Sequence, residues 1–466
     1  MFLALALVIT QVSAVYIDPS SPQSILDAGV LLSKGLMDYY TGNQTGNWPG
    51  MFSNPYYWWE AGVAWNSMID YSYYTGNTTY DDLTHMALLY QSGDYWNYMT
   101  FNQTSTEGND DQAFWGIAAM TAAEKNFTAP GKGYPADWLY FAQATWNTMA
   151  ARWETQNCGG GLRWQIYTWN AGYNYKNLIS NGCLFHLAAR LYKFTNNQTF
   201  LNWAEKTWDW VYEIGFLSPM NPDASNPLQV YLKALDGAAT NQNCTVISPY
   251  EWTYNQGLLI SGCSFLYNMT QDEMWLTRIQ WLWGRALVFF NSTNNIVYEA
   301  ACQAGDHCNN DQRSFKGIFL KCLSLAQQVT PQLASLWQTQ ILASAQGMAQ
   351  SCSGGIDGHT CGLDWSYPGW DGMYGLGEQI SAVDMLNFLL VDTKPGPFNA
   401  QQLGASQAQT NGSTVSGVYG YGNAGLNSSV VTAQTLKLNS GDTAGAAIAT
   451  VVVLAVMIGT TIWLAV

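Results

Sequence analysis

The feature that most constrains this chain is an alternation of two kinds of helical segment along most of its length. Six segments have the apolar spacing of a helix but many polar residues, as expected of helices with one exposed face. They cover approximately residues 22–40, 79–99, 135–155, 198–214, 271–290 and 331–350. Six others are apolar or small nearly all round, as expected of buried helices, and cover approximately 58–74, 110–125, 174–194, 254–268, 313–328 and 376–391. The two kinds alternate strictly, which gives six pairs.

The spacing of these pairs predicts the fold. Landmark residues at the starts of the buried segments are 52 to 79 residues apart: Trp59, Asp111, Asn177, Gln256, Lys316 and Glu378. Sustained strand-type alternation is almost absent. We therefore expect an all-α fold, an (α/α)6 barrel of six inner and six outer helices, with a helical bundle or an open solenoid as the alternative. Small residues near the starts of the inner helices let these helices approach closely at the barrel axis.

The nine cysteines divide into two groups by their surroundings. Six lie in loop-like sequence of a chain that we expect to be secreted, and they offer three candidate disulfides: Cys302 with Cys308, Cys352 with Cys361 and, at longer range, Cys158 with Cys244. The other three lie inside apolar helical runs, where a free thiol acts as a small buried hydrophobe: Cys183, Cys263 and Cys322.

Both ends of the chain carry targeting patterns rather than fold patterns. Residues 1–14 are apolar and end in Val-Ser-Ala, which indicates a secretory signal removed after Ala14. We expect the folded domain over 15–395 and a flexible stalk over 396–439, where Gly, Ser, Thr, Asn and Gln dominate. Small residues, a polar spacer and an apolar tail then predict a glycolipid (GPI) attachment signal over 440–466, with attachment at Asn439 or its neighbours Ser440 and Gly441. A single membrane-spanning helix is the alternative.

Sequons and charge agree with an extracellular protein that binds a neutral ligand. Asn-x-Ser/Thr sequons occur at Asn43, Asn77, Asn102, Asn126, Asn197, Asn243, Asn268, Asn291, Asn411 and Asn427, which predicts N-glycosylation in a secretory pathway. A net charge of −15 argues against nucleic acid or acidic polysaccharide as a partner. The 22 Trp and 28 Tyr suit a hydroxyl-rich ligand, because flat aromatic faces stack on sugar rings. We expect no cofactor and no metal, since paired Cys or His spacing is missing.

Aromatic clusters precede the inner helices and predict a binding cleft. They include "NPYYWWE", "RWQIYTWNAGYNY", "SPYEWTY" and "LDWSYPGWDGMYG". In a barrel of alternating helices the inner helices all begin on one face, so these clusters converge there, although some rings must simply fill the barrel mouth. The candidate substrate-binding residues are Trp59, Trp115, Tyr173, Asn177, Tyr254, Asn255, Gln256, Arg313, Lys316, Trp365 and Trp370. Core packing and ion pairing at helix ends are the alternatives for the aromatic and charged members of this set.

The stretch "GNDDQAFWGIAAMTAAE" places two adjacent carboxylates, Asp110 and Asp111, at the start of an inner helix. Asn109 can cap this helix and Gln112 can complete a capping box, so helix punctuation explains part of the pattern. Glycoside hydrolysis, however, needs one protonated carboxyl and one ionised carboxylate on either side of a glycosidic bond. Neighbours at a helix start can meet the separation of about 5 to 5.5 Å that retaining enzymes use. The pair is therefore a candidate catalytic site.

The order of several motifs resembles glycoside hydrolase family 76. These motifs are "GNDDQAFWGIAAMTAAE", "CGGGLRWQ", "YNQGLLISG" and "RSFKGIF". The resemblance covers most of residues 20–390 and implies a retaining endo-α-1,6-mannanase on an (α/α)6 barrel. It also implies that Asp110 is the nucleophile and Asp111 the general acid/base.

The leader, stalk and lipid signal are most similar to fungal members of that family that act in cell-wall assembly. This similarity implies a monomeric enzyme on the outer face of the plasma membrane and in the cell wall. It would act on α-1,6-linked mannose glycans, with the glycan of GPI-anchored proteins as donor and β-glucan as acceptor. The sequence itself does not decide between hydrolysis and transglycosylation.

Three other functions are weighed against this one. A non-catalytic carbohydrate-binding protein would keep the aromatic cleft but need no carboxylates. A polysaccharide lyase would prefer an acidic substrate, which the charge disfavours. A calcium-dependent mannosidase would use the oxygen-rich "GDHCNNDQ" at 305–312, which turn formation between cysteines explains more simply.

Overall fold

A computed structural model of the chain describes residues 15–223, 225–226, 229–404, 407–410, 413–426, 450 and 453–454. The signal peptide expected at 1–14 and the attachment site expected at Asn439 lie outside these residues, as does most of the 440–466 segment. Asn411 and Asn427 also lie outside them. Within the described part, no helix combines the length and the apolar character needed to cross a membrane.

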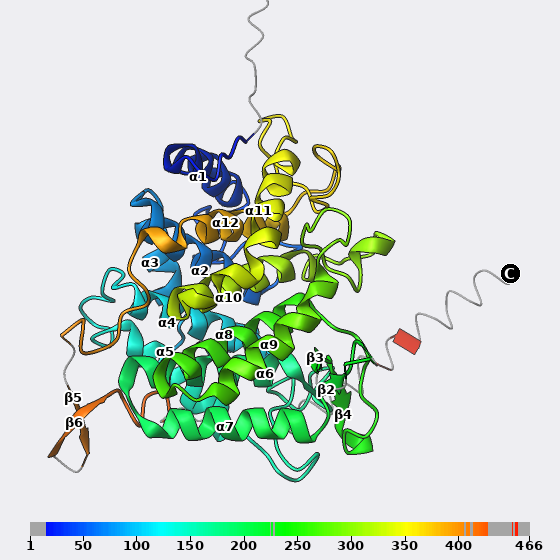
Figure 1. The fold of residues 1–466 in the computed structure, drawn as a ribbon. Helices are drawn as coiled ribbons and strands as arrows, with labels where there is room; N and C mark the ends of the chain where they lie inside the picture. Colours follow the sequence, from blue (N-terminus) through cyan, green and yellow to red (C-terminus); the bar gives the residue numbers. More distant parts are fainter. Residues whose placement is uncertain are drawn as a thin grey trace, which may run out of the picture.

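The six buried segments of the sequence form the inner helices. These are α2 (Trp58–Thr75), α4 (Asn109–Glu124), α6 (Leu178–Thr195), α8 (Thr253–Thr270), α10 (Phe315–Val329) and α12 (Leu376–Leu389). Each inner helix contacts the next, and α12 contacts α2, so the ring closes. Ring closure confirms the (α/α)6 barrel and excludes an open solenoid (Figure 1).

The six polar segments form the outer helices, which lie between successive inner ones along the chain. They are α1 (Pro22–Met37), α3 (Asp81–Tyr90), α5 (Trp138–Ala151), α7 (Gln198–Glu213), α9 (Glu273–Ala286) and α11 (Ala334–Ser351). Helix α7 illustrates the pattern, because Phe200, Ala204, Trp208 and Val211 are buried along one face. The predicted helix over 79–99 ends early at Tyr90, since Gly93 has a left-handed backbone with φ of 72°.

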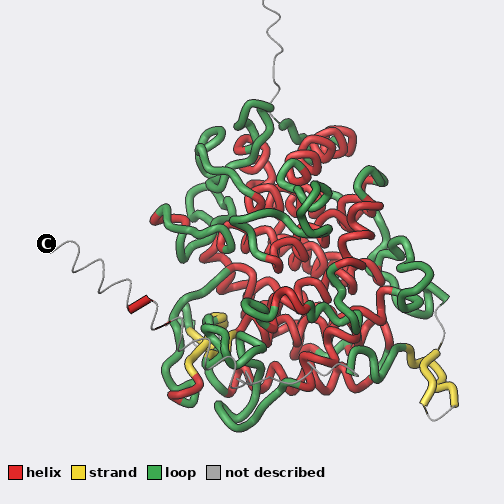
Figure 2. Tube along the Cα trace, turned by 180° about the vertical axis from the view of Figure 1, so that it is seen from behind, coloured by secondary structure: helices red, strands yellow, loops and turns green. Residues whose placement is uncertain are grey.

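The strands of the described residues are short, and they pair antiparallel in twos (Figure 2). Strand β1 (Tyr175–Asn177) pairs with β4 (Gly237–Ala239), β2 (Leu217–Met220) with β3 (Tyr231–Ala234), and β5 (Gln407–Thr410) with β6 (Ser413–Tyr419). The β1–β4 pair takes the first residues of the predicted inner segment at 174–194, so α6 begins at Leu178.

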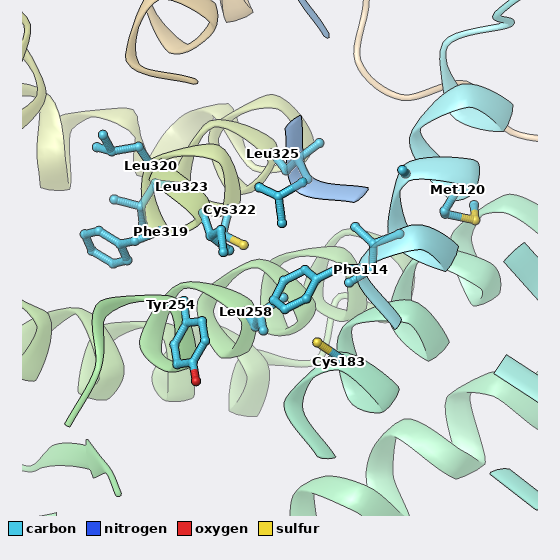
Figure 3. Packing of buried hydrophobic residues seen from close by; sticks show 14 of the residues in the cluster. Phe114, Met120, Cys183, Tyr254, Leu258, Phe319, Leu320, Cys322, Leu323 and Leu325 are labelled. Atoms are coloured by element: carbon cyan, nitrogen blue, oxygen red, sulfur yellow. The ribbon is translucent and has the colours of Figure 1, made fainter. Parts of the chain in front are cut away.

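Three disulfides join the predicted partners: Cys158–Cys244, Cys302–Cys308 and Cys352–Cys361. Cys183, Cys263 and Cys322 are free and buried, as expected from their helical surroundings. Cys183 and Cys322 lie among the aliphatic and aromatic side chains that fill the inside of the barrel (Figure 3).

The beginning of the predicted stalk is bound to the barrel instead of being free. Near its described end, Asn147 of α5 donates to the carbonyl of Ala424 at 3.0 Å, and the Tyr421 hydroxyl donates to Asp137 at 2.8 Å. Phe398 and Ala400 donate backbone hydrogen bonds to Glu124 and Phe194. Residues 396–404 and 419–426, which follow the domain end expected at 395, are therefore held against the barrel.

Close packing of inner helices depends on glycine at particular positions. A Cβ on Gly317 of α10 would lie 2.8 Å from the Cα of Ser381 on α12. Two carbon atoms that are not bonded do not pack this closely, so one of the two helices would have to shift. A Cβ on Gly182 of α6 would meet its nearest neighbour, Leu258, at 4.0 Å. Position 317 therefore has no room for a side chain, whereas position 182 has room for a methyl group.

We expect Gly317→Ala to destabilise the protein by about 1–3 kcal/mol, because α10 and α12 must separate. Gly182→Ala should be neutral or stabilising by up to about 1 kcal/mol, because alanine favours the helix. Denaturant unfolding of both variants measures the difference. Equal stability of the two would contradict the packing described for the α10–α12 contact.

Candidate active site

The first turn of α4 fixes one carboxylate by hydrogen bonding. Gly108 is the N-cap, and its backbone N–H donates to Oδ2 of Asp111 at 2.7 Å. The cap therefore begins one residue earlier than the sequence suggests, and Asp111 takes the role expected of Gln112. A side chain at position 108 would place its Cβ 2.3 Å from Oδ1 of Asp110, so this turn requires glycine. Every residue of α4 except Asp111 is buried.

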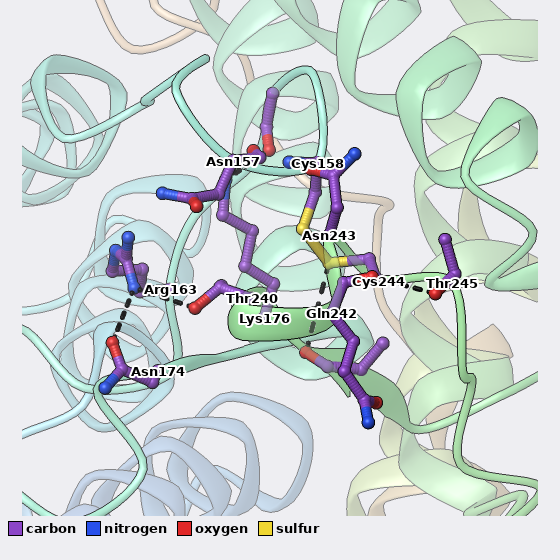
Figure 4. The surroundings of a disulfide bond; sticks show 12 residues. Asn157, Cys158, Arg163, Asn174, Lys176, Thr240, Gln242, Asn243, Cys244 and Thr245 are labelled. Carbon is purple, nitrogen blue, oxygen red and sulfur yellow. Dashed lines mark hydrogen bonds between the residues drawn. A yellow bond between two sulfur atoms is a disulfide. The ribbon is translucent and has the colours of Figure 1, made fainter.

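The loop that follows α5 is attached to this turn. The backbone N–H of Asn109 donates to the carbonyl of Trp164 at 2.8 Å, and its side chain donates to the carbonyl of Arg163 at 2.9 Å. Figure 4 shows how the loop is held from the other side: Arg163 donates to Asn174 and Thr240, near the Cys158–Cys244 disulfide. The indole of Trp164 is thereby placed beside the two carboxylates.

A cavity of about 160 Å³ opens at the starts of the inner helices. Its lining residues are Trp59, Asp110, Asp111, Phe114, Trp164, Tyr175, Asn177, Ile179, Asp236, Tyr254, Asp311 and Phe315. A second cavity of about 290 Å³ shares Trp59, Asp111, Trp164 and Asp311 with the first. The shared residues make the two cavities adjoining parts of one cleft, with Asp111 at their junction.

Burial and mutual repulsion set the protonation of the pair. Asp110 is only 8% exposed, and burial together with the charge of Asp111 raises its pKa well above the usual range. Burial and the charge of Asp311 raise the pKa of Asp111 to about 7, although the hydrogen bond from Gly108 opposes this shift. Two carboxyls this close and this enclosed resist ionising together, which favours the singly protonated pair that a nucleophile and an acid require.

Two further carboxylates line the cavity and were not among the sequence candidates. Asp311 accepts a hydrogen bond from the Trp59 indole at 3.2 Å. Asp236 accepts from the Tyr175 hydroxyl at 2.6 Å and from the Trp252 indole at 3.1 Å. Asp311 lies in the oxygen-rich loop that the sequence suggested for calcium, whereas nothing in the local sequence marks Asp236.

Other missed residues are aromatic. Trp164 lies in a motif that the sequence does single out, "CGGGLRWQ", and Phe114 lies one turn along α4 from Asp110. Phe315, at the start of α10, stacks on Tyr254 with ring centroids 3.9 Å apart. Together with Trp59 these rings form the apolar part of the cavity wall.

Three of the predicted substrate-binding residues reach the cavity. They are Trp59, Asn177 and Tyr254. The side chain of Asn177 also caps α6, because its Oδ1 accepts from the backbone N–H of Ser180 at 3.2 Å. Asn177 thus presents only its remaining polar atoms to a ligand.

Five predicted residues are instead buried and line neither of the two cavities. Trp115 is fully buried between Trp58 and Tyr98. Trp365 is fully buried under the Lys316 ammonium, which lies 4.4 Å from its ring and donates to the carbonyl of Leu363.

The amide of the fourth, Gln256, donates to the carbonyls of Leu232 and Leu282 at 3.1 and 2.6 Å. Its neighbour Asn255 is 1% exposed and lines neither cavity.

The other three predicted residues are half-buried but do not line the two cavities. Tyr173 lies under the Arg163 guanidinium, 4.5 Å from its ring. Arg313 pairs with Glu378 at 3.5 Å, and the Trp370 indole donates to the carbonyl of Met373 at 2.6 Å. Each therefore has a structural partner, and none touches the carboxylate pair.

The residues that the structure describes contain one group of carboxylates and imidazole close enough to share a metal ion: Asp38, Asp357 and His359. It lies outside both cavities and outside the 305–312 loop. The Lys34 ammonium already lies 2.6 Å from Asp38. The loop at 305–312, which was weighed as a calcium site, instead supplies Asp311 to the cleft.

A closed (α/α)6 barrel with a pair of adjacent carboxylates in an aromatic cleft has the architecture expected of a glycoside hydrolase. The sequence matches the model of glycosyl hydrolase family 76 over residues 24–401, so the chain belongs to this family. It is 47% identical to mannan endo-1,6-alpha-mannosidase DCW1 of Saccharomyces cerevisiae over 97% of this chain and 95% of that protein. It is 44% identical to DFG5 of the same yeast over 97% of this chain and 94% of that protein.

Solved structures share the fold. Dfg5 from Chaetomium thermophilum, in complex with glucosamine, is 33% identical with a TM-score of 0.78, covering 88% of this chain and 98% of that chain. An α-1,6-mannanase of Salegentibacter sp. HEL1_6 superposes with a TM-score of 0.61 at 18% identity, covering 78% of this chain and 99% of that chain. The latter structure is an inactive variant with two adjacent aspartates changed to asparagine, in complex with α-1,6-mannotriose.

The charge of Asp311 gives the site a testable pH dependence. Asp311→Asn removes a negative charge that raises the pKa of Asp111, so Asp111 should lose its proton at lower pH. We expect the alkaline limb of the kcat/KM profile to move down by on the order of half a pH unit. Asp306→Asn, an exposed change of the same charge in the same loop, should leave the limb in place. An alkaline limb that moves up, or not at all, would contradict the role of Asp311.

Proposed function

We propose that this glycoside hydrolase is a retaining, endo-acting α-1,6-mannosidase or transglycosidase. The observation that carries the proposal is the adjacent pair Asp110 and Asp111 in the smaller cavity, with Asp111 also lining the adjoining larger one. A cleft that continues on both sides of the reacting groups suits cleavage within a glycan rather than at its end. The names of the yeast relatives and the mannotriose bound to the bacterial mannanase support α-1,6-linked mannose as the substrate.

The chemistry follows the two-step mechanism of retaining glycosidases. In the assignment that the family resemblance implies, Asp110 attacks the anomeric carbon in its ionised form, while Asp111 gives its proton to the departing glycosidic oxygen. The bond to that oxygen breaks and a covalent mannosyl–Asp110 ester forms. Asp111, now ionised, removes a proton from water or from a sugar hydroxyl, which attacks the anomeric carbon and releases Asp110. Water gives hydrolysis, and a sugar gives transglycosylation.

Charge in the cleft supports a donor that carries an amino sugar. Four carboxylates line the smaller cavity, from Asp110, Asp111, Asp236 and Asp311, and neither cavity has Lys or Arg among its described lining residues. A sugar ammonium is attracted to such a site. The glucosamine bound to the Chaetomium Dfg5 supports this part of the proposal, in which the mannose core of a GPI-anchor glycan is the donor and β-glucan the acceptor.

The cellular setting is proposed from the sequence. The leader at 1–14, the attachment signal around Asn439 and the sequons support a glycosylated protein held at the outer face of the plasma membrane and in the cell wall. The eight sequon asparagines from Asn43 to Asn291 are exposed or half-buried, so glycans can reach them. We propose that the enzyme acts there as a monomer and incorporates GPI-anchored proteins into the wall.

Kinetics of the two Asp variants test the catalytic roles. We expect Asp110→Asn and Asp111→Asn each to lower kcat on α-1,6-mannotetraose by about 10³-fold or more, as removal of a reacting group does. With a donor whose leaving group needs no protonation, Asp111→Asn should regain its first step whereas Asp110→Asn should not. Asp209→Asn, on the exposed side of α7, is the control with unchanged turnover.

Unchanged kcat in either variant would show that its carboxylate takes no part in the reaction. Binding of the mannotetraose without turnover by the parent protein would favour the non-catalytic, carbohydrate-binding alternative. Reversal of the rescue pattern would exchange the roles of Asp110 and Asp111 while keeping the reaction class.

The acceptor is tested by product analysis. With α-1,6-mannotetraose as donor and a β-glucan oligosaccharide added as acceptor, we expect mannosylated glucan to increase at the expense of free reducing sugar. Mass spectrometry of the products measures the ratio. Free sugar alone at every acceptor concentration would restrict the enzyme to hydrolysis.

A further inference from the structure

One half-buried arginine contacts both residues that flank the carboxylate pair. Nε of Arg152 donates to Oδ1 of Asn109 at 2.8 Å, and its Nη2 donates to Oε1 of Gln112. Asn109 directly precedes Asp110, and Gln112 directly follows Asp111. Burial lowers the pKa of Arg152 to about 10, so the guanidinium stays charged at neutral pH.

Both flanking residues are in turn fixed to other elements. The amide of Gln112 donates to the carbonyl of Asn97 at 2.6 Å and to Oγ1 of Thr148 at 2.9 Å. Asn109 is bonded to the loop that carries Trp164, as described above. Arg152 itself is the C-cap residue of α5. The guanidinium therefore joins the end of α5 to the two ends of the catalytic turn.

We infer that Arg152 is a positioning residue for the Asp110–Asp111 pair, an inference that rests on the proposed catalytic role of that pair. Two neighbouring side chains must reach different atoms of one sugar, so a small rotation of the turn misplaces both. A planar guanidinium that bonds to the residues before and after the pair resists this rotation, because its donors are held in a rigid fork. A misplacement of about 1 Å can cost about 10²-fold in rate.

Helix α4, which carries the carboxylate pair at its start, is held at its other end by a second arginine, and this arginine offers a control. Arg190 of α6 is fully buried and donates to Glu124, the last residue of α4, at 3.2 and 2.5 Å. It also donates to Thr121 at 2.9 Å. Arg190 thus also attaches α4 to a neighbouring element, but about four turns from the carboxylates. A role limited to stability would make the two arginines equivalent.

Arginine-to-lysine changes separate positioning from stability. Lysine keeps the positive charge and the fold but loses the fork that contacts two partners at once. We expect Arg152→Lys to lower kcat on α-1,6-mannotetraose by about 10- to 100-fold. KM should change by less than about threefold, since the sugar-contacting rings are untouched. Arg190→Lys should lower Tm by a similar amount while leaving kcat within about threefold of the parent.

Crystal structures of the two variants provide a readout that does not depend on turnover. We expect the carboxylates of Asp110 and Asp111 to be displaced in Arg152→Lys and to stay in place in Arg190→Lys. Undisplaced carboxylates in Arg152→Lys, or an equal loss of kcat in both variants, would overturn the inference. If the parent protein itself fails to cleave the mannotetraose, the proposed function fails, and the crystal structures still decide whether Arg152 positions the pair.

Discussion

Six inner helices that run in the same direction around a closed ring must all begin on one face of the protein. The contact between α12 and α2 closes this ring, and each inner helix contacts the next. As a result, residues at the starts of α2, α4, α6, α8 and α10, which are far apart in sequence, line a single cavity. The active site is thus a consequence of the barrel's topology, and the outer helices and loops only shape its walls.

The same geometry sets the electrostatics of the site. A carboxylate at a helix start is normally favoured, because the helix presents its free N–H groups there. In this barrel the start of α4 is also enclosed by neighbouring loops and aromatic rings, so burial raises the pKa values of Asp110 and Asp111. The hydrogen bond from Gly108 and the contacts of Asn109 and Gln112 hold the turn in place. Helix capping and the proposed catalysis therefore use the same turn without competing.

The fold could be predicted from the sequence because the two kinds of helix differ in their residue pattern. Inner helices are buried on all sides and are apolar all round, whereas outer helices are buried on one side and keep a polar face. The residue pattern does not show which side of an inner helix faces the cleft, because such a helix is apolar on every side. Trp115 lies one turn beyond Asp111 on α4, yet it is enclosed by Trp58 and Tyr98. Nearness to a helix start therefore does not ensure access to the cavity.

Long-range contacts limited the prediction of the site further. Asp236 reaches the cavity through Tyr175 and Trp252, contacts that depend on the β1–β4 pairing and carry no local signal. Asp311 was visible as part of an oxygen-rich loop, but only the structure places it beside Trp59. The carboxylate pair itself was recognisable because glycoside hydrolysis needs two carboxyls close together, and because the surrounding motifs resemble those of glycoside hydrolase family 76.

The central claim is that Asp110 and Asp111 divide the work of a retaining glycosidase. It is tested most directly by identifying the residue that becomes glycosylated. A mannosyl donor with a good leaving group is incubated with Asp111→Ala, in which the second step is slow, and the labelled peptide is sequenced by mass spectrometry. We expect one mannosyl ester, on Asp110. An ester on another residue would contradict the assignment, and so would turnover without any covalent intermediate and with inversion at the anomeric carbon.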